Sequence, residues 1–554
     1  MSRGGGPDGA APAAAASARA DQAAADTGAL TASAPGGAGQ APVATPFERA
    51  AGVLLHPTSL PGPHGVGELG PEALRWVDLL AESGQRLWQV LPLGPTGYGD
   101  SPYQSFGTFA GNPYLIDVGA LVADGWLASD DLEPLRALPR AAVDYGGLYR
   151  VKLPLLRRAA DAFLAGGGAA DPGFRAFQER EAAWLEDFAL FMALKEEAGG
   201  APWTEWPRAL RLRDPAALAD ARERLGAETA RQRVWQYWFH RQWARLKAYA
   251  AARDVRVLGD VPIFVALDSA DVWSHPELFH LDDDGRPTVV AGVPPDYFSA
   301  TGQRWGNPLY RWDVHEASGY AWWVARLRSA LAQVDVVRVD HFRGFAAYWE
   351  IPADEPTAVR GRWVEGPGGG LFEVLRRELG GLPVVAEDLG VITPDVEALR
   401  DAFGLPGMKV LQFAFAGGAD DPYLPHNYPR ACVVYTGTHD NDTTAGWYAT
   451  APEAERDHVR RYLGRPDEEV VGGLVRLAYA SVADMAVVPL QDLLGLGSEA
   501  RMNTPGRADG NWRWRFAWED VPGWLGPHLR DMAALYGRLP AGGPVDTPYR
   551  QSSL

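Results

Sequence analysis

The chain has 554 residues, and 52 Lys and Arg against 70 Asp and Glu give it a formal net charge of −18. This charge opposes adsorption to nucleic acid or to an anionic membrane surface, so we expect neither as a partner. No run of about 20 uncharged apolar residues occurs, which argues against a membrane span. The single cysteine, Cys432, lies in an apolar run and fits a core residue in a reducing compartment. We therefore expect a cytoplasmic protein.

The ends of the chain differ in composition from its body. Residues 1–45 are mostly Ala, Gly, Pro, Ser and Thr, with no aromatic residue before Phe47, and we expect a disordered tail there. A signal or transit peptide is the alternative, but charged residues interrupt the alanines: Asp8, Arg19, Asp21 and Asp26. We expect a catalytic body at 46–540 and a short C-terminal tail at 541–554.

Eight short β-branched runs recur along the body, each followed by turn residues or a helical pattern. In chain order they are 53–57, 87–92, 255–260, 336–340, 384–388, 410–415, 433–440 and 486–491. Amphipathic helical stretches lie between them at 71–84, 321–334, 371–381 and 393–404, the last beginning with Thr393 as N-cap and Pro394 at the first helical position. Strand and helix thus alternate eight times.

This alternation predicts an α/β fold, a closed (β/α)₈ TIM barrel with helical and loop insertions. A doubly wound open sheet is the competing architecture. Residues 117–250 are rich in Ala, Leu, Arg and Trp at helical spacing, so we expect a helical insertion there. We expect residues 261–320 to form loops that cover the substrate.

Four carboxylates stand at or just beyond the predicted strand ends: Asp260, Asp340, Glu387 and Asp440. The strands of a parallel barrel all point the same way, so these side chains would meet at the C-terminal mouth, where barrel enzymes have their active sites. For any one acid alone, a helix cap or an ion pair is an equally good explanation. Four together favour a catalytic site.

Two of these acids have unequal predicted surroundings. Arg338 lies two residues before Asp340 on one strand, so both side chains face the same way and the guanidinium would favour an ionised Asp340. A structural ion pair is the alternative. Glu387 follows the apolar run LPVVA, and burial beside another carboxylate would keep it protonated. Such an unequal pair is typical of glycosidic-bond chemistry.

Several long motifs resemble those of the amylomaltases, or 4-α-glucanotransferases, glycoside hydrolase family 77 in the α-amylase clan. The similarity runs from about Val53 to Phe516. The motifs are GYGDSPYQS (97–105), GDVPIFVALDS (259–269), PPDYFSATGQRWGNPLYRW (294–312), VRVDHFRGF (337–345), AEDLG (386–390), YTGTHDND (435–442) and RMNTPG (501–506).

The resemblance implies a role for each matching acid. Asp340 would be the nucleophile that forms a covalent glycosyl-enzyme, and Glu387 would be the general acid and base. Asp440 would stabilise the transition state by binding sugar hydroxyls, with His439 donating a hydrogen bond beside it. Arg338 would orient Asp340.

The resemblance also implies substrate contacts. Asp260 would support the network around Arg338. Tyr103 would stack on the sugar at the cleavage site, with Ser101 nearby. A loop arching over the glucan would carry four further residues: Tyr297, Phe298, Gln303 and Trp305.

The sequence therefore predicts a retaining 4-α-glucanotransferase that moves a segment of an α-1,4-glucan to the 4-hydroxyl of glucose or of another glucan. Its partners would be malto-oligosaccharides, and we expect no cofactor and no metal. An α-amylase-like hydrolase is the nearest alternative, because the same three acids serve both outcomes. A non-catalytic glucan-binding protein is the alternative from another class.

Overall fold

The computed structural model describes residues 47–295 and 299–540. Its larger sheet contains eight parallel strands in the order β10-β11-β12-β1-β2-β3-β6-β9. Their bounds are β1 Ala50–Leu54, β2 Leu87–Gln89, β3 Arg256–Pro262, β6 Val336–Asp340, β9 Val384–Ala386, β10 Gly407–Val410, β11 Cys432–Tyr435 and β12 Met485–Pro489. The first and last strands of that order also meet, because the Ala386 N–H donates to the Pro406 carbonyl at 2.9 Å. The sheet is a (β/α)₈ barrel, not an open doubly wound sheet.

Each of the eight predicted runs overlaps a strand, but only the run at 336–340 has the predicted bounds. The run at 410–415 is a strand only as far as Val410, and a 3₁₀ helix, Leu411–Phe413, follows it. Strand β3 continues beyond its predicted end, so Asp260 lies inside the strand. Asp260 pairs in register with Arg338 of β6, which places the two side chains beside each other.

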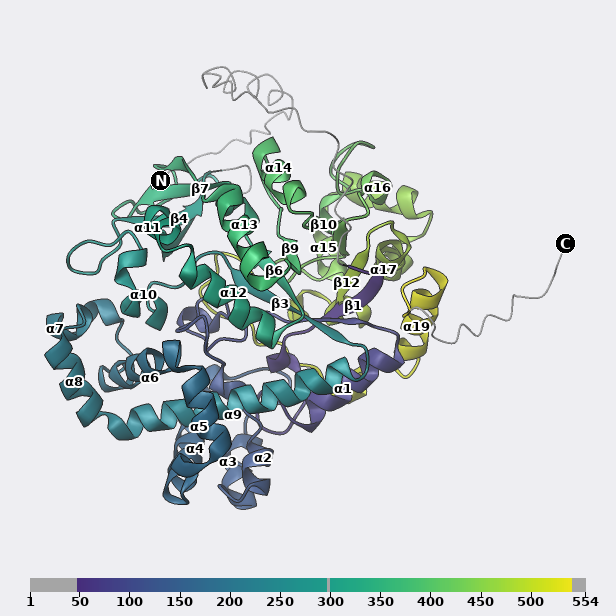
Figure 1. Cartoon of the computed structure of the whole chain (residues 1–554). Helices are drawn as coiled ribbons and strands as arrows, with labels where there is room; N and C mark the ends of the chain where they lie inside the picture. Colours follow the sequence, from purple (N-terminus) through teal and green to yellow (C-terminus); the bar gives the residue numbers. More distant parts are fainter. Residues whose placement is uncertain (1–46, 296–298, 541–554) are drawn as a thin grey trace, which may run out of the picture. The chain divides into compact units, whose positions relative to one another are not determined.

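Helices surround the barrel (Figure 1). In α1, Pro71–Glu82, the buried residues Ala73, Trp76, Val77 and Leu80 follow the 3.6-residue period that the sequence showed. The other helices outside the insertion are α10 Ala270–Ser274, α11 Trp312–Ala317, α12 Ala321–Gln333, α13 Gly368–Leu379, α14 Pro394–Ala402, α15 Thr444–Thr450, α16 Glu453–Leu463, α17 Val470–Ala480, α18 Leu490–Leu493 and α19 Leu525–Leu535.

The segment between β2 and β3 is helical. It contains α2 Val118–Ala123, α3 Glu133–Arg136, α4 Tyr145–Ala165, α5 Pro172–Arg180, α6 Ala182–Glu197, α7 Arg208–Arg211, α8 Pro215–Arg224 and α9 Gly226–Ala251. In Figure 1 these helices gather on one side of the barrel. Large buried aromatic side chains, among them Trp203 and Trp238, pack within this part of the core.

A second, antiparallel sheet has the order β5-β4-β7-β8. Its strands are β4 Val289–Val293, β5 Gln303–Pro308, β7 Ala347–Pro352 and β8 Arg362–Glu365. The expectation of loops at 261–320 missed β4 and β5, and also the short helices α10 and α11. Glycine explains part of this error. A Cβ at Gly292 would lie 2.1 Å from the Gln303 carbonyl oxygen, so β4 and β5 can pair this closely only with glycine there. Glycine has a low strand propensity and hides the strand in the sequence.

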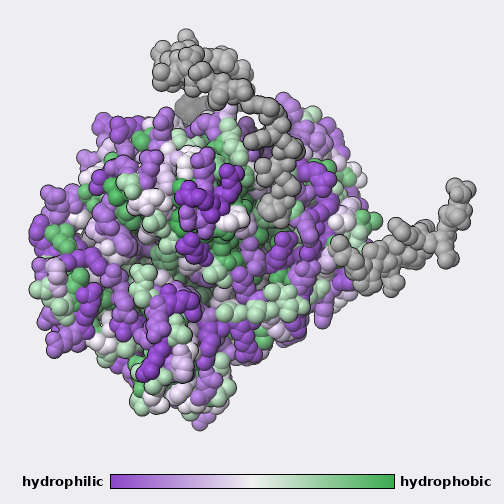
Figure 2. Space-filling model, viewed as in Figure 1, coloured by the Kyte–Doolittle hydropathy of each residue, from purple (hydrophilic) through white to green (hydrophobic). Residues whose placement is uncertain are grey.

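The face of the molecule in Figure 2 is mostly polar, with apolar side chains scattered among the polar ones. No helix in the described ranges is long and apolar enough to cross a membrane.

Candidate active site

Arg338 is the centre of a buried ionic network at the C-terminal end of β6. Its Nη1 donates to Asp260 Oδ2 at 2.7 Å, and its Nη2 lies 2.9 Å from Asp340 Oδ1. Arg338 and Asp260 are almost fully buried, whereas the Asp340 side chain is 31% exposed. One guanidinium therefore holds two carboxylates, and of the two only Asp340 is partly exposed.

Asp260 also binds the tyrosine predicted to contact sugar. Tyr103 Oη donates to Asp260 Oδ2 at 2.9 Å, while the buried Oδ1 accepts no hydrogen bond from the described residues. Burial raises the pKa of Asp260 to about 6, although Arg338 acts in the opposite direction. Asp260 thus links the arginine of β6 to the tyrosine that follows β2.

Glu387 follows β9 directly and is buried, as its apolar approach predicted. The backbone N–H groups of His341 and Leu389 donate to its two carboxylate oxygens, at 2.7 and 3.0 Å. Burial raises the pKa of Glu387 to about 8; Arg338 opposes this rise and Asp340 adds to it. A carboxyl group with that pKa carries a proton at neutral pH and is suited to general acid chemistry.

His341, which the sequence reasoning passed over, connects the two catalytic candidates. It follows Asp340 directly and has a left-handed backbone with φ of 51°, which is uncommon for a residue with a side chain. This conformation turns its N–H toward Glu387. Its ring lies edge-on to Trp305, with ring centroids 4.8 Å apart. The signal for it was its position next to Asp340.

Asp440 stands on a loop that begins after β11. Asn503 Nδ2 donates to its Oδ1 at 2.6 Å, and Arg501 donates to its backbone carbonyl at 2.6 Å. His439 Nε2 lies 3.4 Å from the same carboxylate, and the His439 ring stacks on Tyr103 with centroids 5.0 Å apart. Sequence reasoning gave Asn503 and Arg501 no role, although the RMNTPG motif contains both.

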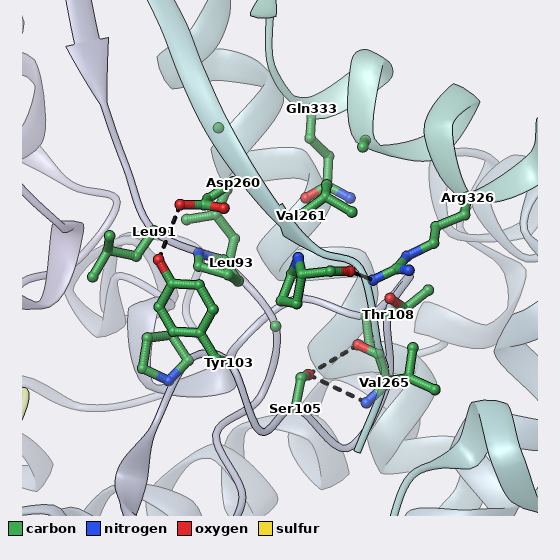
Figure 3. Close-up of a pocket in the computed structure, with 18 of the residues that line it drawn as sticks. Leu91, Leu93, Tyr103, Ser105, Thr108, Asp260, Val261, Val265, Arg326 and Gln333 are labelled. Carbon is green, nitrogen blue, oxygen red and sulfur yellow. Dashed lines mark hydrogen bonds between the residues drawn. The ribbon is translucent and has the colours of Figure 1, made fainter. Parts of the chain in front are cut away.

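A cavity extends behind Tyr103 and Asp260. Figure 3 shows Tyr103 bonded to Asp260 at one side, with Arg326 and Gln333 of α12 at the other. Arg326 donates to the carbonyls of Pro262 and Ile263, so it fixes the chain just beyond Asp260. The helix layer thereby supports the strand that carries the network.

The remaining predicted residues lie around this centre. Ser101 Oγ accepts from the backbone N–H of Tyr103 at 3.2 Å, so it shapes the turn that presents the ring. Gln303 Oε1 accepts from Trp305 Nε1 at 3.1 Å on β5. Tyr297 and Phe298 lie outside the described residues. Among the described residues, no three His, Cys, Asp or Glu side chains are grouped so as to hold a metal ion.

A (β/α)₈ barrel with an arginine-bound carboxylate, a buried carboxyl of high pKa and a third acid at one mouth is typical of enzymes that act on glycosidic bonds. Comparison with known proteins identifies one family within that class. The sequence profile of the family described as 4-alpha-glucanotransferase matches residues 55–520. The chain belongs to this family.

Individual relatives match along nearly their whole length. A 4-alpha-glucanotransferase of Thermus thermophilus is 58% identical over 89% of this chain and 99% of its own, and one of Synechocystis sp. is 48% identical over 89% and 98%. A solved amylomaltase of Streptococcus agalactiae, in complex with acarbose, has a TM-score of 0.87 at 41% identity, covering 89% of this chain and 100% of its own.

Proposed function

We propose that this protein is a retaining 4-α-glucanotransferase that transfers segments of α-1,4-glucans between malto-oligosaccharides. The observation that carries the proposal is the pair of unequal acids: Asp340, partly exposed and held by Arg338, and Glu387, buried with its pKa raised to about 8. Membership of the family indicates the class of reaction. The surroundings of Asp340 suit a nucleophile, and those of Glu387 suit a general acid.

In the first half-reaction, an Asp340 oxygen attacks the anomeric carbon of the donor glucan. The bond from that carbon to the glycosidic oxygen breaks, its electron pair stays on the oxygen, and Glu387 gives that oxygen its proton. The products are a glycosyl ester on Asp340, an ionised Glu387 and a free sugar that leaves with a new 4-hydroxyl.

In the second half-reaction, the 4-hydroxyl of an acceptor sugar replaces the leaving group. Glu387 removes the hydroxyl proton as the oxygen bonds to the anomeric carbon, and the ester electrons return to the Asp340 carboxylate. Two inversions give net retention of the α configuration. Both acids end in their starting protonation states.

Arg338 and Asp260 balance charge across these steps. Asp340 loses its negative charge while it is esterified, which removes one of the two carboxylates around the buried guanidinium. Asp260, 2.7 Å from Nη1, remains as its counter-ion. This arrangement keeps Arg338 in place to stabilise Asp340 when it departs as a carboxylate.

Asp440, His439 and Tyr103 form the wall around the donor sugar in this proposal. Asn503 fixes the Asp440 carboxylate, and the Tyr103 ring is fixed by Asp260 and by stacking on His439. A preformed wall of this kind stabilises positive charge at the anomeric carbon without reorganising during the reaction.

The test is incubation of the purified protein with maltotriose. Transfer conserves the number of reducing ends, so we expect glucose and a ladder of longer oligosaccharides while total reducing ends stay nearly constant. A rise in reducing ends in proportion to bond cleavage would instead identify an α-amylase-like hydrolase.

We also propose a cytoplasmic location, which the single buried Cys432 supports and cell fractionation with an antibody checks.

A further inference from the structure

Trp363 and Val391 are exposed apolar residues beside the proposed active site, and the mechanism above uses neither of them. Trp363, on the edge strand β8, is 40% exposed, and Val391, in the loop after Glu387, is 63% exposed. We propose that these two residues, with Trp349, form a subsite for the glucan chain on the leaving-group and acceptor side of the scissile bond. This inference rests on the proposed function.

Arg343 joins the members of this Trp363 patch. Its guanidinium lies over the Trp363 indole, 3.9 Å from the ring centroid, and Nη1 donates to the Val391 carbonyl. Nη1 also lies 3.4 Å from Thr393 Oγ1, at the start of α14. One buried side chain therefore holds β8 against the loop that follows Glu387.

The tryptophan is also fixed from its own sheet. Trp349 of β7 pairs with Trp363 across the strands, and their ring centroids are 5.3 Å apart in an edge-to-face arrangement. Trp349 Nε1 donates to the Ala358 carbonyl at 3.0 Å, which fixes the second ring. Ring positions set before a ligand binds cost little entropy on binding, which suits contact with the apolar faces of glucose units.

The position along the chain argues for a glucan as the occupant. Arg343 comes three residues after the proposed nucleophile Asp340, and Val391 comes four residues after the proposed acid Glu387. In the proposed mechanism Glu387 lies at the glycosidic oxygen, so its loop would border the sugars beyond the bond. Arg362, whose side chain is exposed beside Trp363 and paired with Glu350, adds hydrogen-bond donors at the rim of the patch.

The experiment compares ligands of different length in a Glu387→Gln background, so that binding is measured without turnover. Calorimetry with maltotriose and maltoheptaose is carried out on this variant and on the same variant with Trp363→Ala. We expect the affinity for maltoheptaose to fall roughly three- to tenfold, as for loss of one aromatic contact, while the affinity for maltotriose changes less than twofold.

The matched control is Trp524→Ala in the same background. Trp524 is 60% exposed at the start of α19 and contacts His528, so its removal is expected to change neither affinity. Trp363→Phe keeps a ring and is expected to lose less than Trp363→Ala, which separates ring contact from a folding defect.

Equal losses for both ligands, or none, would overturn the subsite. So would a change in oligomeric state of the Trp363→Ala protein on size-exclusion chromatography with glucan affinity intact, because the patch would then contact a second copy of the chain. Failure of the unmodified protein to transfer from maltotriose refutes the proposed function itself, which is a separate result.

Discussion

The side chains around Asp260 and those around Trp305 are held in different ways at the barrel mouth. On the Asp260 side, each functional side chain has a fixed polar partner: Arg338 with Asp260, Tyr103 with Asp260, and Asp440 with Asn503. On the Trp305 side, the contacts are ring against ring, and Trp305 has one side-chain hydrogen bond, to the exposed Gln303.

We infer that this difference separates two tasks. The polar side is fixed before any ligand binds, as stabilisation of developing charge requires. The aromatic side makes contacts that tolerate small displacements, which suits successive exchange of a leaving sugar for an acceptor. Substitutions on the polar side should lower the reaction rate, whereas substitutions on the aromatic side should change which acceptor reacts.

The largest expected effects come from the two acids. Asp340→Asn removes the proposed nucleophile and Glu387→Gln the proposed proton donor, and we expect each to lower kcat with maltotriose by roughly 10²- to 10⁴-fold. Asp313→Asn, an exposed acid on α11, is the control and should retain normal turnover. A coupled enzymatic assay of glucose release from maltotriose measures the rates.

A donor with a good leaving group separates the two roles. α-Maltosyl fluoride needs no proton to release fluoride, and azide needs no base to attack the ester. When α-maltosyl fluoride and azide are both present, the Glu387→Gln variant should regain turnover and form α-maltosyl azide, whereas the Asp340→Asn variant should stay inactive. Rescue of Asp340→Asn, or a β-configured product seen by NMR, would contradict the assignment.

A smaller loss is expected from Asp260→Asn, which leaves the buried Arg338 with Asp340 as its single carboxylate partner. Loss of a charged hydrogen bond of this kind corresponds to roughly 10- to 100-fold in kcat. Thermal melting of the variant controls for unfolding, and Tyr103→Phe, which removes only the hydroxyl that binds Asp260, should cost less.

The pH profile of the same variant is diagnostic. In the unmodified protein, kcat/KM should fall above about pH 8, where Glu387 loses its proton, and below about pH 6, where Asp260 gains one. Asp260→Asn abolishes the second titration, so its acidic limb should move to lower pH while its basic limb stays. An unchanged acidic limb would mean that Asp260 does not control the reaction.

The same contrast explains how far the sequence could predict the site. The sequence places Asp260, Asp340 and Glu387 at one mouth because parallel strands bring their C-terminal ends together. Only the structure shows that Asp260 lies inside β3 and pairs beside Arg338. Asn503 and His341 were not given roles, since one reaches Asp440 from a loop 63 residues away and the other acts through its backbone N–H. Strands β4 and β5 were missed because Gly292, Gly306 and Pro308 interrupt the strand pattern.

On the aromatic side we expect a change in outcome more than in rate. Trp305→Ala removes the ring beside His341 and opens the ester to water, so hydrolysis should rise relative to transfer by roughly 2- to 10-fold. Phe298→Ala is expected to act in the same direction. The ratio of new reducing ends to glucose released from maltotriose measures the change, and a ratio equal to that of the unmodified protein would remove Trp305 from acceptor selection.

The smallest expected effect is that of removing residues 1–45, which have no aromatic residue and few aliphatic ones. A chain that begins at Pro46 keeps Phe47, which is buried, and Arg49, which donates to the carbonyls of Ser481 and Ala483 at 2.8 and 2.9 Å. Its melting temperature should lie within about 2 °C of that of the full chain, because a ΔΔG below about 0.5 kcal/mol shifts a large domain by no more than this. Removal of a further five residues, 46–50, takes away both anchors and the first residue of β1, and should lower the melting temperature clearly. Assays with maltotriose and maltoheptaose complete the test, and a rate with either substrate that falls on truncation at Pro46 would contradict the expectation.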